Sequence, residues 1–96
     1  MSDSIVLLVN GTTVTCDQED KNYYLGEIAV GETSYHVEAV EVKVMETSSG
    51  GVKVKALNKL YQERITAWEK RNDGMTPGLV ELDGKSYFVE IQVYAA

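Results

Sequence analysis

The chain has one thiol and one imidazole, Cys16 and His36, and together these two groups could supply a nucleophile and its general base. The local sequence pattern argues against that pair. Cys16 alternates in phase with Val14 on a predicted strand, which suits a small buried side chain, and free cysteine is among the most often buried residue types. His36 lies between Tyr35 and Val37 and belongs on the opposite, polar face. We therefore expect Cys16 to be a structural thiol.

Other site chemistries lack the residues that they need. A zinc site with one His and one Cys would have to borrow carboxylates, which matches the usual ligand sets poorly. Gly50 and Gly51 follow two serines but lack the frame of a phosphate-binding loop, so we interpret them as a flexible turn. The prediction is a non-enzymatic protein without cofactor or metal. A small-ligand binder or enzyme that uses Cys16 and His36 is the remaining alternative.

Acidic residues are concentrated in the first half of the chain. Residues 1 to 51 carry nine Asp or Glu and two Lys, a net charge of −7, whereas residues 52 to 96 carry six acids and seven bases. A concentrated negative field attracts a basic surface and repels phosphates, so direct binding of nucleic acid is disfavoured. The predicted partner-binding acids are Asp17, Glu19, Asp20 and Glu46 at one end of a sheet, with Glu27, Glu38 and Glu41 along its outer strands. The alternative is that these acids form only a solvated face.

Length and composition indicate one domain over residues 1 to 96. The chain is 44% hydrophobic and 25% charged, as in an ordinary globular domain, and a chain of this size can bury one modest core. The apolar run from Ile5 to Val9 is too short for a signal-peptide core or a membrane span. We therefore expect a cytoplasmic protein without membrane contact.

Three glycine-containing turns predict β-hairpins at 10 to 11, 31 to 32 and 83 to 84, with a loop at 17 to 22. The alternation of apolar residues shifts by one position at 39/40, because Val37 and Ala39 are followed by Val40 and Val42. A β-bulge or strand break at 39/40 would keep both sets on one core face. After the turn at 48 to 51, Val54 belongs either to a short strand that pairs back on 40 to 45 or to the start of a helix.

A helix is predicted at about 55 to 72, and strands near 79 to 82 and 85 to 94 follow it. Apolar residues recur there with a helical period, at Leu57, Leu60, Tyr61, Ile65 and Trp68. The stop is predicted at Asn72-Asp73-Gly74. The expected fold is α+β, an antiparallel sheet built from hairpins with the helix packed across one face.

Some apolar residues alternate out of phase with the predicted core. Phe88 and Tyr94 point away from the inward set of the last strand, and Leu25 is out of phase with Tyr24 and Ile28. Such a set is either covered by another layer of the same chain or forms an interface. We predict an oligomer interface at Phe88, Tyr94 and Leu25, and hence a homodimer or a higher oligomer.

The combined pattern favours a small acidic module that binds another protein with a basic surface. The sharper hypothesis is an inhibitor that mimics nucleic acid and blocks a basic nucleic-acid-binding groove, by analogy in size and charge with phage anti-defence proteins of the anti-CRISPR type. The alternative is a structural or accessory subunit of a larger assembly, such as a viral one.

Overall fold

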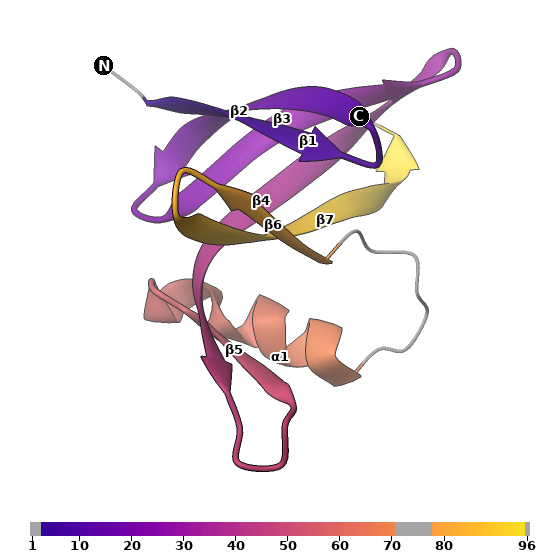
Figure 1. The fold of residues 1–96 in the computed structure, drawn as a ribbon. Coiled ribbons are helices and arrows are strands. Elements are labelled where there is room, and N and C mark those ends of the chain that lie inside the picture. Colours follow the sequence, from indigo (N-terminus) through magenta and orange to yellow (C-terminus); the bar gives the residue numbers. More distant parts are fainter. Residues whose placement is uncertain (1–2, 71–77, 96) are drawn as a thin grey trace.

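The computed structural model describes residues 3–70 and 78–95, which form a mostly β structure with one short helix (Figure 1). The elements in chain order are β1 (Ser4–Val9), β2 (Thr12–Asp20), β3 (Tyr23–Val30), β4 (Thr33–Glu46), β5 (Val52–Ala56), the 3₁₀ turn η1 (Lys59–Tyr61), α1 (Gln62–Lys70), β6 (Gly78–Leu82) and β7 (Lys85–Ala95).

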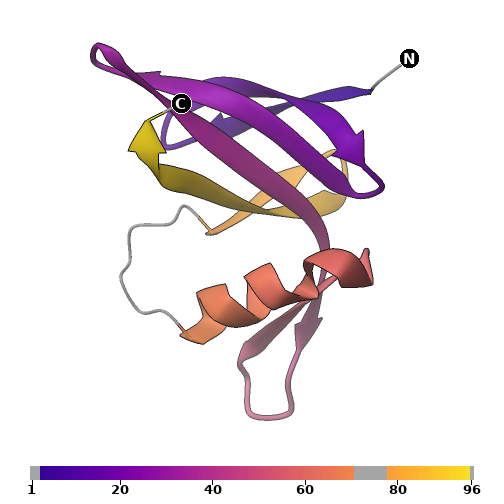
Figure 2. The ribbon, with the colours of Figure 1, turned by 180° about the vertical axis from the view of Figure 1, so that it is seen from behind.

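All strand pairs are antiparallel, and the order across the sheet is β1-β2-β3-β4-β7-β6. The sheet curls until β1 and β6 approach each other, which gives it a nearly barrel-like shape (Figures 1 and 2). The last part of β4 leaves this curled sheet and pairs with β5, while α1 lies beside that pair. The expected antiparallel, hairpin-built architecture is confirmed.

The turn predicted at 31 to 32 is confirmed by the strand register, which pairs Val30 with Thr33, and the other two predicted hairpin turns are confirmed by their backbone angles. Asn10 and Gly11 have φ values of 50° and 81°, and Asp83 and Gly84 have 50° and 79°, so both central residues of each turn adopt the left-handed conformation that a type I′ turn requires. The prediction of a loop at 17 to 22 is wrong, because β2 continues to Asp20 and only residues 21 and 22 form the turn. Two residues suffice for this turn because Asn22 adopts a φ of 61°.

The strand β4 is continuous where a bulge or break was expected. Its pairing with β3 runs without a shift from Thr33 to Val40. Val37 and Ala39 face the interior of the curled sheet, whereas Val40 and Val42 face a second apolar cluster on the outside. The apparent change of phase at 39/40 therefore reflects a strand that is buried on both faces, and no residue is inserted.

The first apolar cluster fills the inner face of the curled sheet. It consists of Leu7, Val9, Val14, Cys16, Tyr24, Ile28, Val37, Ala39, Tyr87 and Val89. Gly26 is required beside it, because a Cβ there would lie 2.5 Å from the backbone oxygen of Thr15 and 2.9 Å from Cys16 Sγ. Each large aliphatic side chain buried in this cluster contributes about 1.5–3 kcal/mol to folding.

The second cluster connects the outer face of β4 and β7 to β5 and α1. Its buried members are Val40, Val42, Val54, Ala56, Ile65 and Phe88. Val54 lies in β5 and pairs with Val44, so the strand interpretation of this segment is confirmed and the helix interpretation is wrong. The segment forms a strand because its alternate residues Val54 and Ala56 are buried in this cluster beside the outer face of β4.

The helix is shorter than predicted. β5 extends to Ala56, the Asn58 side chain caps η1 by accepting from the Leu60 N–H, and α1 itself begins only at Gln62. Ile65 is fully buried as expected, but Leu57 and Leu60 precede the α-helix and are exposed. The side chain of Trp68 and the predicted stop at 72 to 74 lie outside the described residues.

Candidate functional site

Cys16 and His36 lie on opposite faces of the sheet. Cys16 is completely buried inside the curled sheet, where burial and then the charge of Asp17 raise the pKa of its thiol to about 11. His36 is exposed and lies opposite Glu27 in the β3–β4 register. The prediction that Cys16 is buried is therefore confirmed, and Cys16 and His36 do not lie together as a nucleophile and its base would. Among the described residues, no three His, Cys, Asp or Glu side chains gather as a metal site would require.

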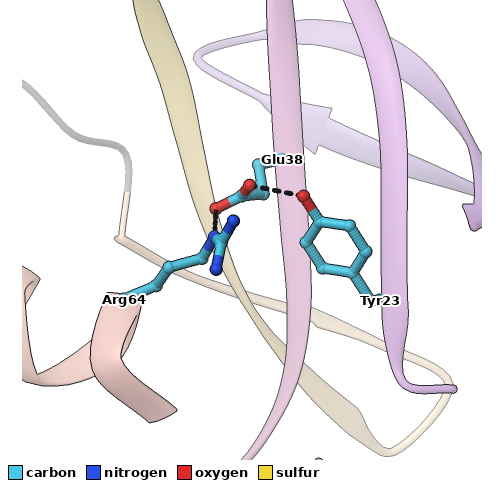
Figure 3. A network of polar contacts seen from close by, with 3 residues as sticks. All are labelled: Tyr23, Glu38 and Arg64. Atoms are coloured by element: carbon cyan, nitrogen blue, oxygen red, sulfur yellow. Dashed lines mark hydrogen bonds and ion pairs between the residues drawn. The ribbon is translucent and has the colours of Figure 1, made fainter. Parts of the chain in front are cut away.

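Glu38 is the centre of a polar network on the outer face of β4 (Figure 3). Its carboxylate accepts a 2.5 Å hydrogen bond from the Tyr23 hydroxyl and lies 2.8 Å from Nε of Arg64 on α1. The side chain is largely buried, and only 7% of the residue's surface is exposed. Burial and the hydrogen bond to Glu38 raise the pKa of Tyr23 well above its ordinary value. This carboxylate therefore joins α1 to the sheet.

Two stacked tyrosines extend the network to the β2–β3 turn. The rings of Tyr23 and Tyr61 are nearly parallel with centroids 4.0 Å apart, and the Arg64 guanidinium lies 5.6 Å and 5.3 Å from those centroids. The Tyr61 hydroxyl donates to Asp20 over 2.7 Å. This bond, together with the Lys21 backbone N–H, lowers the pKa of Asp20. The Asp20 carboxylate is exposed but already accepts two hydrogen bonds from within the chain.

Glu41 is also held within the chain. Its carboxylate accepts a 3.0 Å hydrogen bond from Asn22 Nδ2, and only 8% of the residue is exposed. Its backbone donates to the Asn22 oxygen and accepts from the Leu57 N–H. The prediction that Glu38 and Glu41 belong to an exposed acidic surface is wrong, because both side chains are buried by contacts between distant segments. The available signal in the sequence was that Glu38 and Glu41 each stand between apolar residues in a segment whose apolar residues occupy both alternation phases.

The remaining acids are exposed, but they do not all lie together. Asp17, Glu19 and Asp20 follow one another along the end of β2, and Glu27 is exposed on the adjacent β3. Asp17 accepts a 2.6 Å hydrogen bond from the Ser4 hydroxyl. Glu46 is elsewhere, since β4 continues six residues past Val40, the partner of Tyr23, which is roughly 20 Å along the strand. The predicted four-residue cluster therefore lacks Glu46.

The predicted oligomer interface is corrected at Phe88. This ring is 0% exposed and belongs to the second apolar cluster, so the outward face is covered by another layer of the same chain. Its strand, β7, lies between β4 and β6. Leu25 is half-buried between its register partners Asp17 and Glu38. The side chain of Tyr94 lies outside the described residues.

A basic face that the sequence analysis missed lies on the ribbon formed by β4 and β5. Lys43 pairs directly with Lys55, and Lys53 lies two residues further along the same face of β5. All three are exposed. The signal was weak in the sequence, because Lys43 is separated from the other two lysines by an acidic residue and a glycine-containing turn.

Comparison with known proteins gives no relative for this chain: no family model, no curated protein and no solved structure matches it. Within residues 3–70 and 78–95, no helix is long and apolar enough to cross a membrane.

Proposed function

We propose that this chain is a non-enzymatic interaction module that acts in the cytoplasm and binds a basic surface of another protein through the exposed acids of β2 and β3. The observation that carries the proposal is the position of Asp17, Glu19 and Glu27, which are all exposed on two adjacent strands. In this region Lys21 is the one base between Asp3 and Glu32. Exposed charges of one sign accelerate association with a surface of the opposite sign.

The more specific proposal is an inhibitor that occupies a nucleic-acid-binding groove. A basic groove is shaped to receive a row of phosphates, and a sheet surface that displays carboxylates can present charge of the same sign. In this proposal α1 has a structural role on the outer face of the sheet, because Arg64 pairs with Glu38 of β4 and Ile65 packs in one cluster with Phe88 of β7. α1 leaves Asp17, Glu19 and Glu27 exposed, so these acids can contact a partner.

The test compares the wild-type chain with a variant in which Asp17, Glu19 and Glu27 are all replaced by lysine. Each is immobilised, and proteins retained from a lysate are identified by mass spectrometry. A true partner is retained by the wild type alone, associates more slowly as ionic strength rises, and releases its nucleic acid when this chain binds. Asp20 is left unchanged because it holds Tyr61.

A matched control replaces Glu32, Glu63 and Glu81, which are exposed on other segments of the chain, by lysine. This control keeps the same net charge as the test variant. A partner that is retained equally by both variants, or that binds this chain and its nucleic acid together, contradicts the proposed function.

A further inference from the structure

One edge of the molecule carries an apolar centre between two regions of opposite charge. The β2–β3 turn and the start of η1 lie one above the other, on the left in Figure 1 and on the right in Figure 2, and the β4–β5 ribbon projects below them in both views. Hydrogen bonds connect the first two of these segments, since Asn58 Nδ2 donates to the Lys21 oxygen over 2.7 Å. The third is continuous with the second through β5.

The apolar centre is formed by Leu57 and Leu60, which are 48% and 75% exposed. Their backbone is fixed, because the Leu57 N–H donates to the Glu41 oxygen and the Leu60 N–H donates to Asn58 Oδ1. The adjacent Tyr61 is held by its stack on Tyr23. Exposed leucines on a fixed backbone lose little backbone conformational entropy when a partner covers them.

On one side of this centre lies the basic face of the ribbon. Lys53 and Lys55 alternate in phase with Leu57, and Lys43 pairs with Lys55 across the strands. Like charges directly opposite each other destabilise a strand pair. Within the described part of the chain none of these three lysines contacts a carboxylate. Residues 43 to 56 have a net charge of +2.

On the other side lies the end of β2, where Asp17, Glu19 and Asp20 are exposed. With Lys21, residues 17 to 21 have a net charge of −2, equal and opposite to that of the ribbon. Val40 is the partner of Tyr23 beside the acidic end, and along β4 from it Lys43 lies three residues further and Met45, the partner of Lys53, five residues further. These steps are roughly 10 and 17 Å, about one to two Debye lengths at physiological salt. The two charged regions are therefore largely screened from each other, and the described residues form no ion pair between them.

We propose that this edge binds a second copy of the chain in a two-fold symmetric dimer. A two-fold axis through Leu57 and Leu60 sets the two apolar centres against each other. The same rotation places the lysines of each copy against the acids of the other, as an isologous contact requires. The dimer would cover Asp17 and Glu19, so a basic partner of the kind proposed above would compete with it. The dimer itself does not depend on that partner.

The test is sedimentation velocity of the full chain at about 10 to 300 μM and at about 50, 150 and 500 mM salt. The expected result is a monomer–dimer equilibrium that weakens about tenfold or more over this salt range. Leu60→Asp should abolish the dimer. Leu8→Asp is the matched control, because Leu8 is 62% exposed on β1 and should leave the dimer intact.

Charge-reversal variants distinguish the proposed dimer from self-association through any other surface. Lys53→Glu combined with Lys55→Glu should weaken self-association, and so should Asp17→Lys combined with Glu19→Lys. An equimolar mixture of the two variants should form a heterodimer. In it the ribbon of the first variant, which is now acidic, faces the end of β2 of the second variant, which is now basic, and the two unchanged regions also carry opposite charges. A chain that stays monomeric at low salt, a dimer indifferent to Leu60→Asp, or a mixture without heterodimer overturns the proposal. Circular dichroism verifies that each variant is folded.

Discussion

The thiol of Cys16 couples the stability of the inner core to pH. It is fully buried in the first apolar cluster, where burial and the charge of Asp17 raise its pKa from 9.0 to about 11. In the unfolded chain the same thiol is solvated and ionises near its ordinary pKa. Ionisation between these two pKa values therefore stabilises the unfolded chain alone.

The sign and the size of the effect follow from this difference. A folded pKa above the unfolded value contributes stability that is complete below pH 9 and is lost as the pH rises through about 11. At pH 10 the unfolded thiol is about tenfold more often ionised than protonated, whereas the folded thiol is mostly protonated. The wild type should then lose about 1.4 kcal/mol of unfolding free energy from this group.

The perturbation is Cys16→Ala, measured by urea unfolding with circular dichroism at about pH 7 and about pH 10. At the lower pH the variant should be less stable by about 1 kcal/mol, because a small core group is lost. At the higher pH this deficit should disappear. Tyrosines whose pKa values burial raises, such as Tyr87 at about 12, titrate in both proteins and cancel in the difference.

The result that refutes this reasoning is a stability difference between wild type and Cys16→Ala that is the same at both pH values. Thr13→Ala, on the exposed face of the same strand, is the control and should change little at either pH.

Two further variants test the second cluster and the polar network. Phe88→Ala should lower the unfolding free energy by about 3–5 kcal/mol in urea titrations, because it empties a fully buried site; a loss below about 1 kcal/mol would show that the ring is not core. Arg64→Ala should cost about 1–2 kcal/mol, less than for a fully buried pair, because water can reach the half-exposed guanidinium position and solvate Glu38. Lys70→Ala, exposed on the same helix, is its control, and equal losses from the two substitutions would contradict a special role for the Arg64 pair.

Local chemistry in the sequence predicted the turns and the strands around them. Asn10-Gly11 and Asp83-Gly84 favour type I′ turns wherever they occur, since Asn, Asp and Gly tolerate positive φ. Alternation over a few residues likewise placed Cys16 inside and His36 outside. The acidic character of β2 and β3 also follows directly from the residues present.

The tertiary structure decided which side chains are free, because that depends on contacts between segments far apart in the chain. Glu38 is enclosed by Tyr23 and by Arg64, which lies 26 residues later, and Phe88 is covered by a layer that includes Ile65. Alternation distinguishes the two faces of a strand but does not show that both faces of β4 are buried. The lysine ribbon, too, exists only because β5 pairs with β4. Strand pairing and burial are non-local, so residue types and spacing predict the elements but not the surface that they leave exposed.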